Sequence, residues 1–90
     1  MSRLLNLNVY TPTGGRTSIR IEKEVIDAVD LMAKSYGQTR SRLITLIQDS
    51  TRPKAGERTS AIRVEVLLWA LGKRVSSYHA SAREMSEAQL

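Results

Sequence analysis

The chain has 90 residues, enough for one small domain, and its 41% hydrophobic and 26% charged residues are typical of a folded protein rather than a disordered one. The absence of cysteine excludes a disulfide scaffold, a thiol nucleophile and a cysteine-based zinc site, and no apolar run approaches the roughly 18 residues of a membrane-spanning helix. The net charge of +5, with no acidic residue before Glu22, favours a polyanionic partner, and we expect a cytoplasmic protein without a membrane partner.

The sequence begins with two short segments that have the alternation of β-strands. Residues 5–9 alternate leucine or valine with asparagine, and residues 17–21 alternate polar and β-branched side chains. Between them, residues 11–15 (TPTGG) combine proline with a glycine pair, which is strong turn chemistry. We interpret residues 1–15 as an N-terminal arm or an extra strand. Three arrangements stay open for it: a hairpin with residues 17–21 that could obstruct groove entry, an arm that wraps DNA, or pairing with a neighbouring dimer.

Two amphipathic helices follow the second strand. The first is predicted over residues 23–36, and Gly37 is its expected stop because glycine adopts a positive φ without a Cβ penalty. Thr39 can cap the second helix with its hydroxyl, and the apolar stripe of that helix ends near Ser50.

The remaining third of the chain is predicted to hold one more helix. Residues 51–59 include proline, glycine and three basic side chains and are interpreted as a basic loop. Residues 60–78 carry an apolar pattern long enough for a third helix, which would serve packing, oligomerisation or a protein partner. Residues 79–90 have no apolar stripe and are predicted to be a flexible tail.

A short strand followed by two helices leaves unpaired backbone groups along a sheet edge. Pairing with the same strand of a second chain solves this by two-fold symmetry. The alternation then directs Ile19 and Ile21 onto the helices and Arg16, Ser18 and Arg20 away from them. A two-stranded ribbon fits the major groove of DNA, where arginine can bond guanine and serine can bond either donor or acceptor edges.

Two motifs carry a family resemblance: residues 17–25 (TSIRIEKEV), and residues 37–41 (GQTRS) before an apolar helix. Together they resemble the ribbon-helix-helix (Arc/MetJ/CopG-like) superfamily over residues 16–50, and residues 60–67 (SAIRVEVL) resemble a variant with an additional C-terminal helix. The resemblance implies a mainly α fold with a short β-ribbon, in which an intertwined homodimer shares a two-stranded antiparallel sheet.

The same resemblance implies a sequence-specific transcriptional regulator, a repressor that inserts its dimeric ribbon into the major groove of double-stranded DNA. The base-contacting residues would be Arg16, Ser18 and Arg20. The phosphate-contacting residues would be Thr39, Arg40 and Ser41 with their backbone amides, since a helix N-terminus favours phosphate. The expected partners are DNA and a second copy of the chain, with higher oligomers on DNA also possible.

Two alternatives stay open. The chain could be an antitoxin-type autoregulator whose C-terminal part, through residues 60–78, binds a toxin, or a dimerisation and interaction module that binds no DNA. We expect neither an enzyme nor a cofactor or metal site, because His79 is the single histidine and the acids of residues 22–30 have no evident nucleophile beside them.

Overall fold

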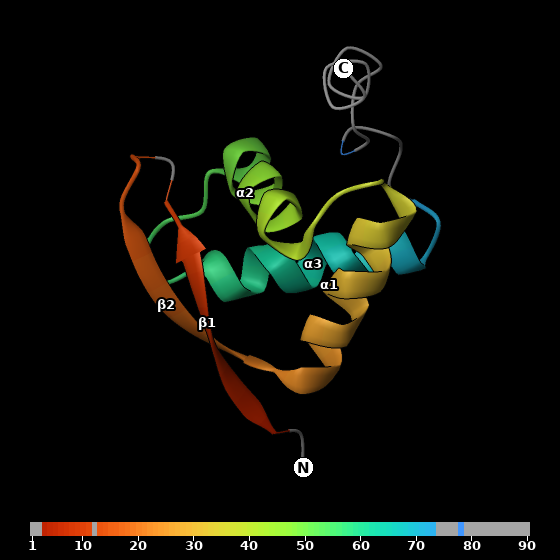
Figure 1. Cartoon of the computed structure of the whole chain (residues 1–90), viewed down its shortest axis with the longest axis horizontal. Helices are drawn as coiled ribbons and strands as arrows, with labels where there is room; N and C mark the ends of the chain where they lie inside the picture. Colours follow the sequence, from red (N-terminus) through yellow and green to blue (C-terminus); the bar gives the residue numbers. More distant parts are fainter. Residues whose placement is uncertain (1–2, 12, 74–77, 79–90) are drawn as a thin grey trace.

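A computed structural model describes residues 3–11, 13–73 and 78 of the chain, and Figure 1 shows a two-stranded hairpin followed by three helices. The elements are β1 (Leu4–Tyr10), β2 (Arg16–Glu22), α1 (Lys23–Ser35), α2 (Arg40–Thr51) and α3 (Arg58–Ala70). The predicted flexible tail at residues 79–90 lies outside the described residues. The fold class of a mainly α protein with a short β-ribbon is thus as expected.

The N-terminal segment forms one strand of a hairpin within the chain. β1 pairs with β2 of the same chain in antiparallel register, from Leu4 opposite Glu22 to Tyr10 opposite Arg16. In the turn, the Thr11 amide donates to the Gly15 carbonyl over 2.9 Å, and Gly14 has the positive φ of 90° that a three-residue hairpin loop requires. The second strand of the sheet is therefore β1 of the same chain, and the homodimer stays a prediction.

The alternation of the two strands gives the hairpin one apolar and one polar face. The inward face is formed by Leu5, Leu7, Val9, Thr17, Ile19 and Ile21. The three helices lie on this side of the hairpin (Figure 1), and contacts join α1 and α3 to β2 and α2 to β1. No described element covers the opposite face, which leaves it open to solvent.

The core lies between the hairpin and the helices and is almost entirely aliphatic. Met32 of α1, Leu43 and Ile47 of α2, and Ile62 of α3 are each 0% exposed. Tyr78 is also buried, with its ring edge-on to Tyr36 at a centroid distance of 5.9 Å. A core this small has little redundancy, because each buried aliphatic side chain contributes a large share of the apolar area removed from water.

The ends of the first two helices follow the predicted signals. Gly37 has a φ of 70°, and the Gln38 amide bonds the Ala33 carbonyl over 2.8 Å, as a glycine-terminated helix requires. Thr39 caps α2, and its hydroxyl accepts a hydrogen bond from the Arg42 amide over 3.1 Å.

The third helix differs from the predicted range of residues 60–78. It begins at Arg58 and ends at Ala70, so the basic loop is shorter than the predicted residues 51–59. The cause of the early end is Gly72, which has a φ of 70° and allows the Lys73 amide to bond the Leu68 carbonyl over 2.9 Å. Among the described residues, no helix is both long and apolar enough to cross a membrane.

Candidate nucleic-acid interface

The outward face of the hairpin brings together polar side chains from both strands. The register places Asn6 opposite Arg20, Asn8 opposite Ser18, and Tyr10 opposite Arg16. All six residues are exposed. The three predicted base-contacting residues Arg16, Ser18 and Arg20 therefore lie in one row along β2, with a second polar row beside them on β1. We call these six residues the ribbon face.

Contacts within the ribbon face order part of it. The Ser18 hydroxyl donates a hydrogen bond of 2.8 Å to Oδ1 of Asn8, and the Arg16 guanidinium carbon lies 5.6 Å from the centre of the Tyr10 ring. These contacts fix the relative positions of side chains on neighbouring strands before any ligand arrives.

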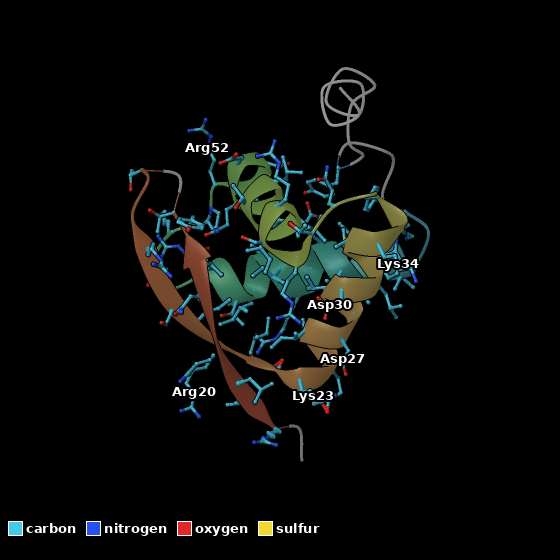
Figure 2. The ribbon with its side chains drawn as sticks, viewed as in Figure 1. Arg20, Lys23, Asp27, Asp30, Lys34 and Arg52 are labelled. Carbon is cyan, nitrogen blue, oxygen red and sulfur yellow. The ribbon has the colours of Figure 1, made fainter. Side chains whose placement is uncertain are left out.

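Arg20 is the most available cation of the ribbon face. Its side chain points away from the helices (Figure 2), and it forms no ion pair with any residue that the structure describes. An incoming anion or base edge therefore has no internal partner to displace at this position.

The acidic residue at the base of β2 is neutralised by a helix. Nε of Arg63 in α3 donates to Oε2 of Glu22 over 2.9 Å, and a second guanidinium nitrogen bonds the other carboxylate oxygen. These hydrogen bonds hold the pKa of Glu22 below its ordinary value. The ribbon face therefore keeps the positive sign that Arg16 and Arg20 give it.

The residues predicted to contact a DNA phosphate lie at the N-terminus of α2. Thr39, Arg40 and Ser41 are all exposed there. Thr39 satisfies the Arg42 amide, whereas the amides of Arg40 and Ser41 occupy the first two helical positions, which have no intrahelical acceptor. Free amides and the positive end of the helix dipole together favour an anion.

The Arg40 side chain has a structural partner that the sequence did not reveal. Its Nε and a terminal nitrogen donate to the two carboxylate oxygens of Asp30 over 2.6 and 2.7 Å, which joins α2 to α1. This pairing lowers the pKa of Asp30 and raises that of Arg40. The two residues are ten positions apart on different helices, so no local sequence signal indicates the pair.

Three residues of the ribbon face, Asn6, Asn8 and Tyr10, were absent from the predicted site. The signal for them was present, because the alternation that directs Leu5 and Leu7 inward directs all three outward. No group of three or more potential metal ligands occurs among the residues that the structure describes.

A comparison with protein families shows one relationship. The model of the ribbon-helix-helix domain matches residues 11–70, which include β2 and all three helices, while β1 precedes the matched segment. No curated protein and no solved structure matches the chain. The match covers more than half of the 90 residues, and its order of strand and helices agrees with the structure. The chain therefore belongs to the ribbon-helix-helix domain family.

Proposed function

We propose that the protein is a sequence-specific DNA-binding transcriptional repressor. Proteins of the ribbon-helix-helix family are generally DNA-binding regulators and typically bind as dimers. The observation that carries the proposal is the exposed row of Arg16, Ser18 and Arg20 on the side of the hairpin that no described helix covers.

The chemistry of this row suits base edges in the major groove. Arginine can donate two parallel hydrogen bonds to O6 and N7 of guanine, and a serine hydroxyl can bond either a donor or an acceptor edge. A two-stranded ribbon is one of the elements that the major groove admits. Arg16 and Arg20 would read guanines, and Ser18 would bond the base edge between them.

Thr39, Arg40 and Ser41 would anchor a phosphate and set the orientation of the ribbon. Phosphate contacts add affinity that is independent of sequence and falls as the salt concentration rises. In this proposal the anchor is formed by the backbone amides at the start of α2, while the Arg40 side chain holds Asp30. The working form is a homodimer on an operator, active in the cytoplasm and without a cofactor or an enzymatic reaction.

The proposal is tested by fluorescence anisotropy of labelled DNA titrated with the full chain. One duplex is the promoter region upstream of its own gene, and the other is a scrambled duplex of equal composition, each at about 50 and 200 mM salt. We expect preference for the promoter and weaker binding to both at the higher salt. No binding to either duplex at the lower salt would overturn the proposal.

A second candidate, an antitoxin-type autoregulator, is favoured by one feature of α3. Val64, Leu67 and Leu71 recur at helical spacing and are 53, 57 and 60% exposed. An exposed apolar stripe of this kind is typical of a surface that binds another protein. Co-expression with the product of a neighbouring reading frame, followed by size-exclusion chromatography, tests it. A stable complex that Leu67→Ser abolishes is expected for an antitoxin, and separate elution of the two proteins contradicts it.

A further inference from the structure

We propose that Tyr78 is a positioning residue for the phosphate anchor, which is formed by the backbone amides of Arg40 and Ser41. Tyr78 fixes the turn between α1 and α2 and thereby the direction in which these amides point. The inference rests on the proposed DNA-binding function and adds to it a residue that acts without touching DNA. Tyr78 lies beyond the residues 11–70 that the family model matches, so membership of the family does not supply this role.

The Tyr78 side chain is enclosed by the core, although α3 already ends at Ala70. It is 2% exposed and is one of the largest buried side chains. A buried tyrosine removes a large apolar area from water, and its hydroxyl then requires a hydrogen-bond partner. A side chain this enclosed cannot contact DNA, so any effect that it has on DNA binding acts through the residues it packs against.

Two contacts join Tyr78 to the turn between α1 and α2. Its ring is edge-on to the ring of Tyr36, the C-cap residue of α1, at a centroid distance of 5.9 Å. Its carbonyl accepts a hydrogen bond of 3.1 Å from the side-chain amide of Gln38. Tyr36 and Gln38 flank Gly37, where the chain reverses with a φ of 70°. Tyr78 therefore holds the turn on both sides of its glycine.

A third contact joins Tyr78 to α3. Its hydroxyl donates a hydrogen bond of 2.5 Å to Oε1 of Glu65, whose side chain is buried at 3% exposure. Polar atoms in a core require such partners, because an unsatisfied one costs free energy. Tyr78 therefore bridges α3 and the turn that precedes α2, and it fixes the turn relative to the body of the fold.

The turn determines where and in which direction α2 begins. Gln38 is followed directly by Thr39, the N-cap residue of α2, whose hydroxyl accepts from the Arg42 amide. The next two residues, Arg40 and Ser41, carry the free amides that would bind a phosphate. A hydrogen bond weakens steeply when its donor is misaligned. A shift of the turn would therefore weaken the phosphate contact even if α2 remained helical.

The start of α2 is also held by Arg40, which binds Asp30 of α1. These two side chains are 44 and 43% exposed, and an ion pair with this much solvent contact contributes little and is screened by salt. The contacts of Tyr78 are buried and do not depend on an exposed charge. We therefore expect Tyr78 to be the stronger restraint on the anchor.

The test compares the full chain with variants that differ in the link to the turn. Tyr78→Ala removes the ring, and the milder Gln38→Ala removes only the bond to the Tyr78 carbonyl. Tyr78→Phe keeps both contacts with the turn and loses the bond to Glu65. The matched control is Ile47→Val, at a 0% exposed position nearer the other end of α2, where the loss of stability should resemble that of one lost hydrogen bond.

The measurement is ethylation interference on the promoter duplex, in which ethylation of a phosphate removes its charge and blocks its contacts. Circular dichroism first confirms that each variant is folded at the temperature used, and Gln38→Ala decides the test if Tyr78→Ala does not fold. Anisotropy titrations on the promoter and scrambled duplexes give the affinity and the sequence preference of each protein.

We expect the wild-type chain, Tyr78→Phe and Ile47→Val to require the same phosphates. Tyr78→Ala and Gln38→Ala should bind the promoter duplex about ten-fold more weakly, because the contact between the amides and a charged phosphate is lost. They should lose interference at the anchored phosphates alone and keep the preference for the promoter over the scrambled duplex, since the ribbon face is unchanged.

An unchanged interference pattern in Tyr78→Ala and Gln38→Ala would overturn the positioning role and leave the proposed DNA-binding function intact. Loss of the same phosphates in Tyr78→Phe or Ile47→Val would show that the contacts with the turn are not the cause, and would also overturn it. Failure of the wild-type chain to prefer the promoter would overturn the proposed function together with this inference.

Discussion

Arg20 and Arg40, which the sequence analysis assigns to DNA contact, differ in whether they already bind a carboxylate within the protein. Arg20 on the ribbon face has no ion-pair partner among the described residues, whereas Arg40 is bound to both oxygens of Asp30. Truncating each to alanine removes one positive charge in both cases. The pair of variants therefore separates base reading from general electrostatic attraction.

The expected magnitudes follow from these environments. A bidentate arginine–guanine contact contributes about 1–3 kcal/mol of discrimination, so Arg20→Ala should weaken binding to the promoter duplex by about 5- to 150-fold. On a scrambled duplex, where no base contact exists, the loss should be much smaller. Arg40→Ala should weaken binding to both duplexes by the same small factor, because it removes a charge but no base contact.

Arg40→Ala should also have a cost in folding. The Arg40 and Asp30 side chains are 44 and 43% exposed, and ion pairs with this much solvent contact contribute about 0–1 kcal/mol. Urea unfolding should therefore show a decrease in the free energy of unfolding of at most about 1 kcal/mol for Arg40→Ala. Arg20→Ala should leave that free energy almost unchanged.

Anisotropy titrations of both variants on the promoter and scrambled duplexes measure these factors. The decisive quantity is the ratio of the two dissociation constants for each protein. The reasoning is refuted if Arg20→Ala lowers affinity for both duplexes equally, or if Arg40→Ala reduces the ratio as strongly as Arg20→Ala does.

Three further predictions concern stability. Leu43→Ala should lower the free energy of unfolding by about 2–5 kcal/mol in urea titrations, because the side chain is 0% exposed; a loss below about 1 kcal/mol would contradict its place in the core. Arg40 lowers the pKa of Asp30 in the folded state, and this pairing stabilises the fold above the unfolded-state pKa near 3.9. That stabilisation is lost as the pH falls through the lower folded-state pKa. Asp30→Asn should therefore remove part of the acid dependence of thermal unfolding, and an unaltered pH profile would contradict the pairing. Gly14→Ala should lower the free energy of unfolding by about 1–2 kcal/mol through its positive φ alone, since no atom lies within 4 Å of the added Cβ; unchanged stability in urea would argue against this turn.

Local patterns in the sequence predict most of the helices and strands. The alternation around Ile19 and the turn at residues 11–15 have direct counterparts in the hairpin, and Gly37 ends α1 through the expected positive φ. Gly72 carries the same stop signal as Gly37 and shortens α3, but the apolar pattern that continues beyond it favoured a longer helix. At this position backbone geometry outweighs hydrophobic periodicity.

The parts that the sequence could not provide depend on contacts between distant residues. The Arg63–Glu22 and Arg40–Asp30 pairs link separate elements, and Gln48 is buried because its amide bonds the β1 edge. The pairing of β2 with β1 also depends on distant residues, because Leu5, Leu7 and Val9 of β1 pack against the core that the helices form.

The central claim is that the ribbon face reads base edges in the major groove. The most direct measurement replaces guanine and adenine in the promoter duplex, one position at a time, by their 7-deaza analogues, which lack the N7 acceptor of the major groove and keep base pairing. The account predicts a loss of about 1–3 kcal/mol in binding free energy at each contacted purine, and no change at purines outside the bound site. Unchanged affinity at every substituted position would contradict it.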